Sequence, residues 1–77
     1  MKVTVKFFGL LSEVANCDEE VFMTDGHTVT ELLQVIYRKH PKLQLQQFQI
    51  AQGNKLVTDQ IKLTGELIAL LPPFSGG

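Results

Sequence analysis

The sequence has a single cysteine, Cys17, and this scarcity bears on where the protein works. One cysteine cannot form an internal disulfide, whereas a small secreted domain usually depends on several. Residues 1–6 alternate between polar and apolar side chains and lack the uninterrupted apolar stretch of a signal peptide or a membrane span. The sequence therefore predicts a soluble cytoplasmic protein that does not enter a membrane.

An excess of positive charge is also missing. Seven Lys and Arg residues stand against eight Asp and Glu residues, for a formal net charge of -1, and no basic stripe is present to neutralise phosphates. A glycine-rich phosphate loop is absent as well, so any ATP that the protein needs must be bound by another protein. We expect no nucleic-acid partner and no cofactor bound by this chain.

The length of 77 residues leaves room for one domain, since a hydrophobic core needs roughly 50 or more residues. With 44% hydrophobic and 19% charged residues, the composition is that of a folded globular domain. A domain this small cannot enclose a deep catalytic pocket as well as a core. Any chemistry is therefore expected at an edge or a terminus.

Period-two alternation predicts strands over residues 2–8 and 18–24. A short helical turn is expected over residues 10–15, between those two strands. Phe48 and Ile50 open a third strand, a tight hairpin at residues 53–54 leads to a short return strand at 56–57, and a last strand covers 67–71. Residues 43–47 are expected to form a connector.

One helix is predicted over residues 29–39. Thr28 is suited to be its N-cap, with Glu31 three residues later completing a capping box, and Pro41 cannot continue the helix. Its apolar face has helical spacing. The residues of that face are Val29, Leu32, Leu33, Ile36 and His40.

This order of elements predicts an α+β fold in which one main helix packs on a mixed sheet, as in the ubiquitin-like β-grasp. The first and last strands are the most apolar, so we expect them to lie side by side in the centre of the sheet. Residues 1–71 would form the domain. Residues 72–77 would form an extended Gly-Gly tail that leaves it.

The tail reads Pro72, Pro73, Phe74, Ser75, Gly76, Gly77. Proline fixes φ near -65° and keeps the preceding residue extended, so the tail should leave the domain as a stiff arm. A terminal glycine offers an unhindered carboxylate, which reacts only after its oxygen becomes a leaving group, for example in an acyl-adenylate. The alternative is that the tail is only a frayed terminus without a function. Phe74 argues against this alternative, because an aromatic residue that has no core to join more often binds a partner protein.

Residues 67–77, with the sequence LIALLPPFSGG, resemble the carboxyl terminus of the small subunit of molybdopterin synthase, and residues 5–9 are similar to that family's first strand. The resemblance implies that Gly77 is adenylated by an E1-like enzyme that uses ATP and magnesium. It implies next that Gly77 receives sulfur as a thiocarboxylate from a sulfur donor protein. The tail would enter the large catalytic subunit, which builds the molybdopterin dithiolene on a cyclic pterin precursor, in a complex with two copies of each subunit.

Two residues depart from that family's usual pattern. An Arg commonly precedes the Glu after the first strand, where this chain has Ser12 before Glu13, and Phe74 replaces a small aliphatic residue. Three alternatives stay open. They are a sulfur carrier of the thiamine pathway, a ubiquitin-like modifier joined to lysines through Gly77, and a plain interaction module.

The other reactive residue types are interpreted as structural. Cys17 stands in an acidic stretch that would raise its pKa and disfavour the thiolate. His27 and His40 have no cysteine or carboxylate at ligand spacing in the sequence, so neither a metal site nor a catalytic triad is expected. Lys55 and Lys62 are expected to be solvated. Phe7, Phe8, Phe22 and Phe48 are taken as core residues, with Phe8 and Phe22 on the weaker side of their strands.

Overall fold

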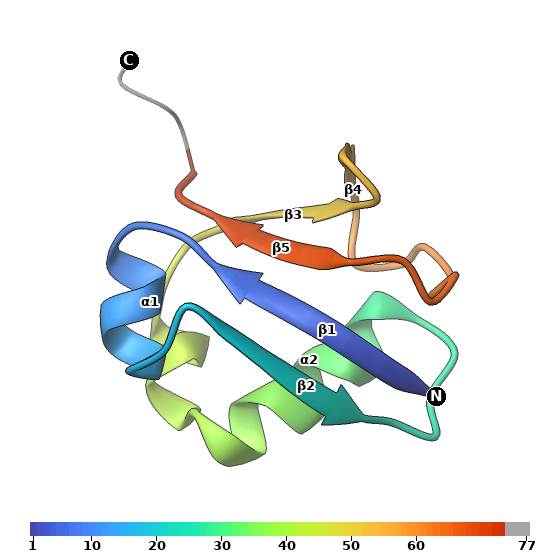
Figure 1. Ribbon diagram of the computed structural model, residues 1–77, viewed down its shortest axis with the longest axis horizontal. Coiled ribbons are helices and arrows are strands. Elements are labelled where there is room, and N and C mark those ends of the chain that lie inside the picture. The colour runs from blue at the N-terminus through green and yellow to red at the C-terminus, as the bar shows by residue number, and fades with distance from the viewer. Residues whose placement is uncertain (74–77) are drawn as a thin grey trace.

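The structure, a computed structural model, describes residues 1–73. Its elements follow the predicted order closely (Figure 1). In chain order they are strand β1 (Lys2–Phe7), helix α1 (Leu10–Ala15), strand β2 (Glu19–Met23), helix α2 (Val29–Lys39), 3₁₀-helix η1 (Pro41–Leu45), and strands β3 (Gln49–Gln52), β4 (Lys55–Val57) and β5 (Ile68–Leu71).

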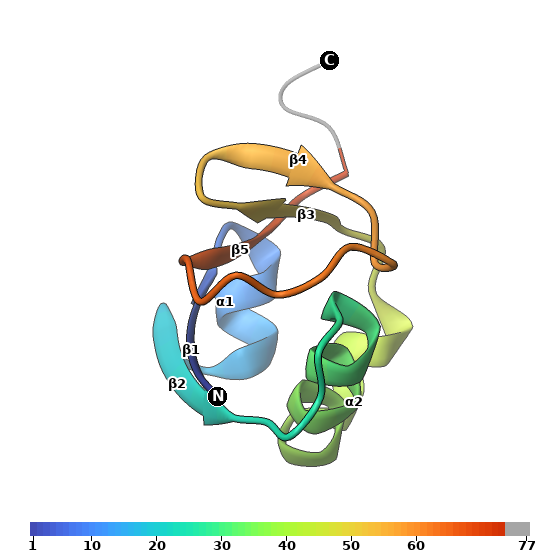
Figure 2. The same ribbon diagram turned by 90° about the vertical axis from the view of Figure 1, so that its right-hand side faces the viewer.

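The five strands form one mixed sheet in the order β2-β1-β5-β3-β4. Strands β1 and β5 run parallel, and every other neighbouring pair is antiparallel. The first and last strands of the chain are therefore adjacent inside the sheet, which confirms the prediction made from their apolar character. Helix α2 covers one face of this sheet (Figure 2), and the fold is the ubiquitin-like β-grasp.

Helix α2 begins and ends where the sequence predicts. The Thr28 hydroxyl accepts a hydrogen bond from the Glu31 amide, and the Glu31 carboxylate accepts one from the Thr28 amide, so the capping box is complete. The last turn closes with a hydrogen bond of 2.8 Å from the His40 amide to the Ile36 carbonyl. Pro41 follows and starts η1, because its ring prevents continuation of α2.

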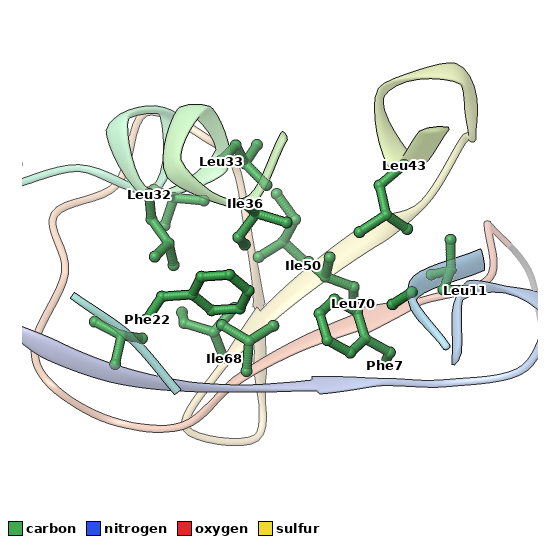
Figure 3. Packing of buried hydrophobic residues seen from close by; sticks show 14 of the residues in the cluster. Phe7, Leu11, Phe22, Leu32, Leu33, Ile36, Leu43, Ile50, Ile68 and Leu70 are labelled. Carbon is green, nitrogen blue, oxygen red and sulfur yellow. The ribbon is translucent and has the colours of Figure 1, made fainter. Parts of the chain in front are cut away.

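The core lies between the sheet and α2, and Figure 3 shows the two layers of side chains meeting there. The sheet contributes alternate residues of its central strands, and α2 contributes the apolar face predicted for it. The largest fully buried side chains are Leu32, Ile36, Leu43, Ile68, Leu70, Val3, Val5 and Val29. His40, at the end of the predicted face, is partly buried.

The structure separates two phenylalanines that the sequence treated alike. Phe22 pairs with Val3 across β1 and β2 and is 4% exposed, so it is a full member of the core. Phe8 is 43% exposed because it follows Phe7 and points to the opposite face. The placing of Phe22 on the weaker side was wrong: its apolar neighbours Val21 and Met23 are the ones exposed.

The segment expected to be a plain connector contributes to the core. Residues Pro41–Leu45 form η1, and Leu43 within it has no exposed surface. Leu45, two residues later, is 82% exposed. A 3₁₀-helix has three residues per turn, so these two leucines cannot share a face.

None of the helices within residues 1–73 is long and apolar enough to cross a membrane. The longest, α2, has 11 residues, whereas a spanning helix needs about 20.

Candidate functional site

The tail begins where β5 ends, at Leu71. Strand β5 is held on both sides, by β1 in parallel and by β3 antiparallel, so its end is fixed in position. The Phe8 amide donates a hydrogen bond of 3.1 Å to the Leu70 carbonyl, so the pairing of β1 with β5 continues to the residue before Leu71. Pro72 and Pro73 follow and are exposed. The root of the tail is thus anchored by the two central strands.

Gly9 lies against this root. A β-carbon placed on Gly9 would come within 3.1 Å of Pro72 Cγ. Gly9 also has φ 58° and ψ -134°, a combination that residues with a side chain rarely adopt. The glycine after β1 therefore allows both the turn into α1 and the close approach of Pro72.

The predicted reactive residue and most of the predicted tail lie outside the described residues. These are Phe74, Ser75, Gly76 and Gly77. Their roles stay predictions.

Within residues 1–73, no helix covers the sheet face opposite α2 (Figure 2). Phe8, Leu56 and Leu67 are 43%, 59% and 39% exposed. With the half-buried Ala69 and Leu71 they line a shallow groove of about 450 Å³. We call these five residues the open apolar face. It reaches the root of the tail, because Leu71 directly precedes Pro72.

A second apolar patch borders the tail root from the other side. Leu10 and Leu45 are 57% and 82% exposed, and both line a hollow of about 460 Å³ with Pro72 and Pro73. The tail root therefore stands between two exposed apolar surfaces. Exposed apolar surface beside a projecting segment is typical of a protein interaction site.

The structure also brings His40 next to Cys17 and Glu20, although the sequence placed only Cys17 and Glu20 near each other. The Cys17 thiol donates to Glu20 Oε1 at 3.6 Å, and His40 Nε2 lies 2.7 Å from the same oxygen. Lys39 forms an ion pair with Glu20 Oε2. His40 comes from the end of α2, 20 residues away from Glu20, so its place beside Cys17 follows from the tertiary fold.

Two pKa shifts follow from this cluster. Burial raises the pKa of the Cys17 thiol, and its hydrogen bond to the Glu20 carboxylate raises it further, as the acidic stretch predicted. For Glu20, burial opposes ionisation, but the hydrogen bonds from Lys39, His40 and Cys17 outweigh it, and the net effect lowers its pKa. The Cys17 thiol is thus protonated at neutral pH, which disfavours it as a nucleophile.

The remaining residues singled out in the sequence lie elsewhere. His27 is exposed, and its backbone amide donates to Glu31, with no role for its ring in that contact. Lys55 and Lys62 are exposed, as predicted. Phe7 is buried and Phe48 packs against the core from its rim.

The comparison with protein families shows to which family the chain belongs. The ThiS family matches residues 5–77, which is nearly the whole chain. The protein belongs to the ThiS family. No protein with curated function matches the sequence.

Solved structures similar to this ThiS-family chain cover nearly its whole length. One is a Pyrococcus furiosus protein named as molybdopterin converting factor subunit 1, with 26% identity and a TM-score of 0.86, covering 96% of this chain and 99% of that one. SAMP1 from Haloferax volcanii has 25% identity, a TM-score of 0.81 and full coverage of both chains. A third is in a complex of subunits 1 and 2 of the molybdopterin-converting factor from Helicobacter pylori, with 28% identity, a TM-score of 0.70 and full coverage of both.

Proposed function

We propose that this protein is the sulfur carrier of molybdopterin synthesis and that Gly77 is its reactive residue. Two observations support the choice of pathway. The chain ends in the Pro-Pro-Phe-Ser-Gly-Gly sequence. Of the solved structures that it matches over nearly its whole length, one is named as subunit 1 of a molybdopterin converting factor and another as a complex of subunits 1 and 2 of such a factor. The observation that most supports the proposal is that residues 72–77 directly follow strand β5, which is paired on both sides.

The first step takes place on a partner enzyme. The Gly77 carboxylate attacks the α-phosphorus of ATP, magnesium on that enzyme assists, and pyrophosphate leaves. A sulfur donor protein then delivers sulfur at the oxidation level of sulfide. Hydrosulfide attacks the carbonyl carbon of the acyl-adenylate, AMP leaves, and Gly77 then carries a thiocarboxylate. Glycine suits both steps because the carbonyl carbon of Gly77 has no side chain beside it to block an incoming nucleophile.

The second step takes place in the large catalytic subunit. Six residues, 72–77, reach at most about 20 Å when fully extended, so the thiocarboxylate can react well away from the domain. The thiocarboxylate sulfur then attacks a carbon of the cyclic pterin precursor, and an oxygen substituent leaves that carbon. Water cleaves the acyl–sulfur bond, so that the sulfur stays on the pterin and Gly77 returns to a carboxylate. We propose that the open apolar face and the tail root dock on this partner, in a complex with two copies of each subunit.

One specific observation favours a second function. SAMP1, which this chain matches over its full length, is a small archaeal modifier protein. The activated Gly77 carbonyl could equally be captured by a lysine amine, which would form an isopeptide bond. Gly-Gly remnants on lysines of other proteins, lost when Gly77 is deleted, would establish this modifier function.

The test of the proposal is high-resolution mass spectrometry of untagged protein from a host with its pathway intact. We expect the mass gain of an oxygen-to-sulfur exchange on the peptide that contains Gly77. The gain must be assigned to that peptide, because oxidation of Met1 or Met23 changes the mass by almost the same amount. An unmodified carboxylate, even after incubation with activating enzyme, ATP and a sulfur source, would leave a plain interaction module.

Two variants and a binding experiment complete the test. Gly77→Ala and a chain with one added residue should both fail to form the thiocarboxylate while unfolding at the same temperature as the parent protein. Capture of a molybdopterin synthase large subunit supports the proposed pathway. Capture of a thiazole synthase instead would assign the protein to thiamine synthesis.

A further inference from the structure

We propose that Cys17, Glu20 and His40 form a binding site for a divalent cation of the zinc class. One ligand atom from each residue, the sulfur, a carboxylate oxygen and an imidazole nitrogen, lies within 4.8 Å of both others. Around a tetrahedral zinc ion, with bonds of about 2.0 to 2.3 Å, such atoms are about 3.3 to 3.6 Å apart. The sulfur and the nitrogen lie 3.6 and 2.7 Å from the Glu20 oxygen, so binding would require His40 and Glu20 to move apart by less than about 1 Å.

The backbone holds the three ligands in place without a metal. The Cys17 amide donates to the Ser12 carbonyl at 3.1 Å, and the adjacent Asp18 carbonyl accepts from the Phe7 amide at 2.9 Å. Glu20 lies in β2, which pairs with β1. His40 is fixed at the end of α2 by its amide hydrogen bond to Ile36. Little chain order would therefore be lost on binding.

The surroundings of the imidazole also favour a fixed orientation. The ring centroids of Phe7 and Phe22 lie 6.0 and 6.3 Å from that of His40, and both rings meet it edge-on. The Glu20 and His40 side chains are only 14% and 15% exposed. A ligand held by packing and partly shielded from water is typical of metal sites.

Charge supports a cation. In the metal-free cluster the Cys17 thiol donates to the Glu20 carboxylate, and His40 contacts the same oxygen. When the ion binds, it displaces the thiol proton into solvent, and the resulting thiolate and the carboxylate together neutralise the divalent charge. The Lys39 side chain, which pairs with Glu20 from outside, is 62% exposed and can move into solvent when the ion enters. Sulfur, nitrogen and oxygen as ligands favour zinc over magnesium or calcium, which bind oxygen.

This site would connect the loop after α1, strand β2 and the end of α2. A domain of this size with one cysteine has no disulfide, and a bound ion would hold these three segments together. The inference does not depend on the proposed function, because none of the three ligands belongs to the tail.

The test uses the full chain in its carboxylate form, because a thiocarboxylate sulfur would bind metal itself. The metal-free, reduced protein is titrated with cobalt(II), a spectroscopic substitute for zinc. We expect one equivalent to bind, with a thiolate-to-cobalt charge-transfer band that zinc then removes. Zinc should also raise the unfolding temperature of the parent protein.

Cys17→Ser should abolish the band, and His40→Gln should weaken binding by at least about tenfold. The matched control is His27→Gln, which removes the chain's other histidine and should bind like the parent protein. Circular dichroism of each variant establishes that it is folded. The proposal is overturned if the folded parent protein shows no thiolate band at saturating cobalt, or if Cys17→Ser and His40→Gln bind as tightly as the parent.

Discussion

Gly9 and Pro72 meet at the base of the tail, where a β-carbon on Gly9 would lie 3.1 Å from Pro72 Cγ. Strands β1 and β5 are parallel neighbours, so the turn after β1 and the start of the tail come to the same end of the sheet. Through this contact, the backbone conformation of the turn between β1 and α1 affects the position of Pro72 at the start of the tail.

Gly9→Ala is expected to lower the free energy of unfolding by about 1 to 3 kcal/mol, since the backbone at position 9 is unfavourable for a residue with a side chain. It should also weaken binding to the catalytic partner, because the new methyl group displaces Pro72. Urea unfolding and a binding titration measure the two effects. Gly65→Ala is the matched control: Gly65 has φ 94° but no atom within 4 Å of the new β-carbon, so only stability should fall. If Gly9→Ala bound the partner as tightly as the parent protein, the contact between Gly9 and Pro72 would not influence how the tail is placed for binding.

Leu67→Glu is expected to weaken partner binding at least about tenfold, or 1.4 kcal/mol, because docking would bury an unpaired carboxylate. Leu67 is 39% exposed and lies on the open apolar face, so the fold should tolerate the change. Gln34→Glu adds the same charge on the exposed side of α2 and should bind normally. Calorimetric titration with the partner subunit distinguishes the two. Equal affinities for both variants would remove the open apolar face from the interface.

The Glu20 cluster predicts a dependence of stability on pH. The pKa of Glu20 is lowered in the folded protein, so the unfolded chain binds the proton more readily. Its contribution is present above the unfolded pKa of about 4.3 and is lost as the pH falls through the lower folded value. Glu20→Gln should therefore be less stable at pH 7 and lose less stability on acidification than the parent protein.

Urea midpoints measured between pH 7 and pH 3, with a chelator present, test this expectation. Glu19→Gln is the control, since Glu19 is exposed and adjacent in sequence, and it should keep the pH dependence of the parent protein. If Glu20→Gln and the parent lose equal stability on acidification, the cluster does not stabilise the carboxylate of Glu20.

Ile36→Ala is expected to destabilise the domain by about 2 to 5 kcal/mol, because Ile36 has no exposed surface and its truncation leaves a cavity. Leu45→Ala is the matched control. Leu45 is 82% exposed, so its removal should change the free energy of unfolding by no more than about 0.5 kcal/mol. Chemical denaturation measures both, and similar losses for the two variants would contradict the arrangement of the core.

Much of the fold could be predicted because its signals are local. The capping box of Thr28 and Glu31, the spacing of the apolar face and Pro41 together define α2 within a few residues of chain. The hairpin at Gly53 and Asn54 is of the same kind, since both residues have positive φ and this conformation favours glycine and asparagine. The chemistry proposed for the tail also rests on the sequence and stays a prediction, because Gly77 lies outside the described residues.

The remainder depended on contacts between distant segments. Which side of β2 is buried was settled by the pairing of Phe22 with Val3, because in a run of three apolar residues the alternation has no clear phase. Leu43 could be recognised as core only once η1 had packed against α2. The approach of His40 to Cys17 and Glu20 required the end of α2 to reach the start of β2, and no sequence spacing records such a distance. Local preferences thus determined the helices and strands, whereas the burial of side chains, the sidedness of β2 and the Cys17 cluster were decided when the sheet and α2 packed together.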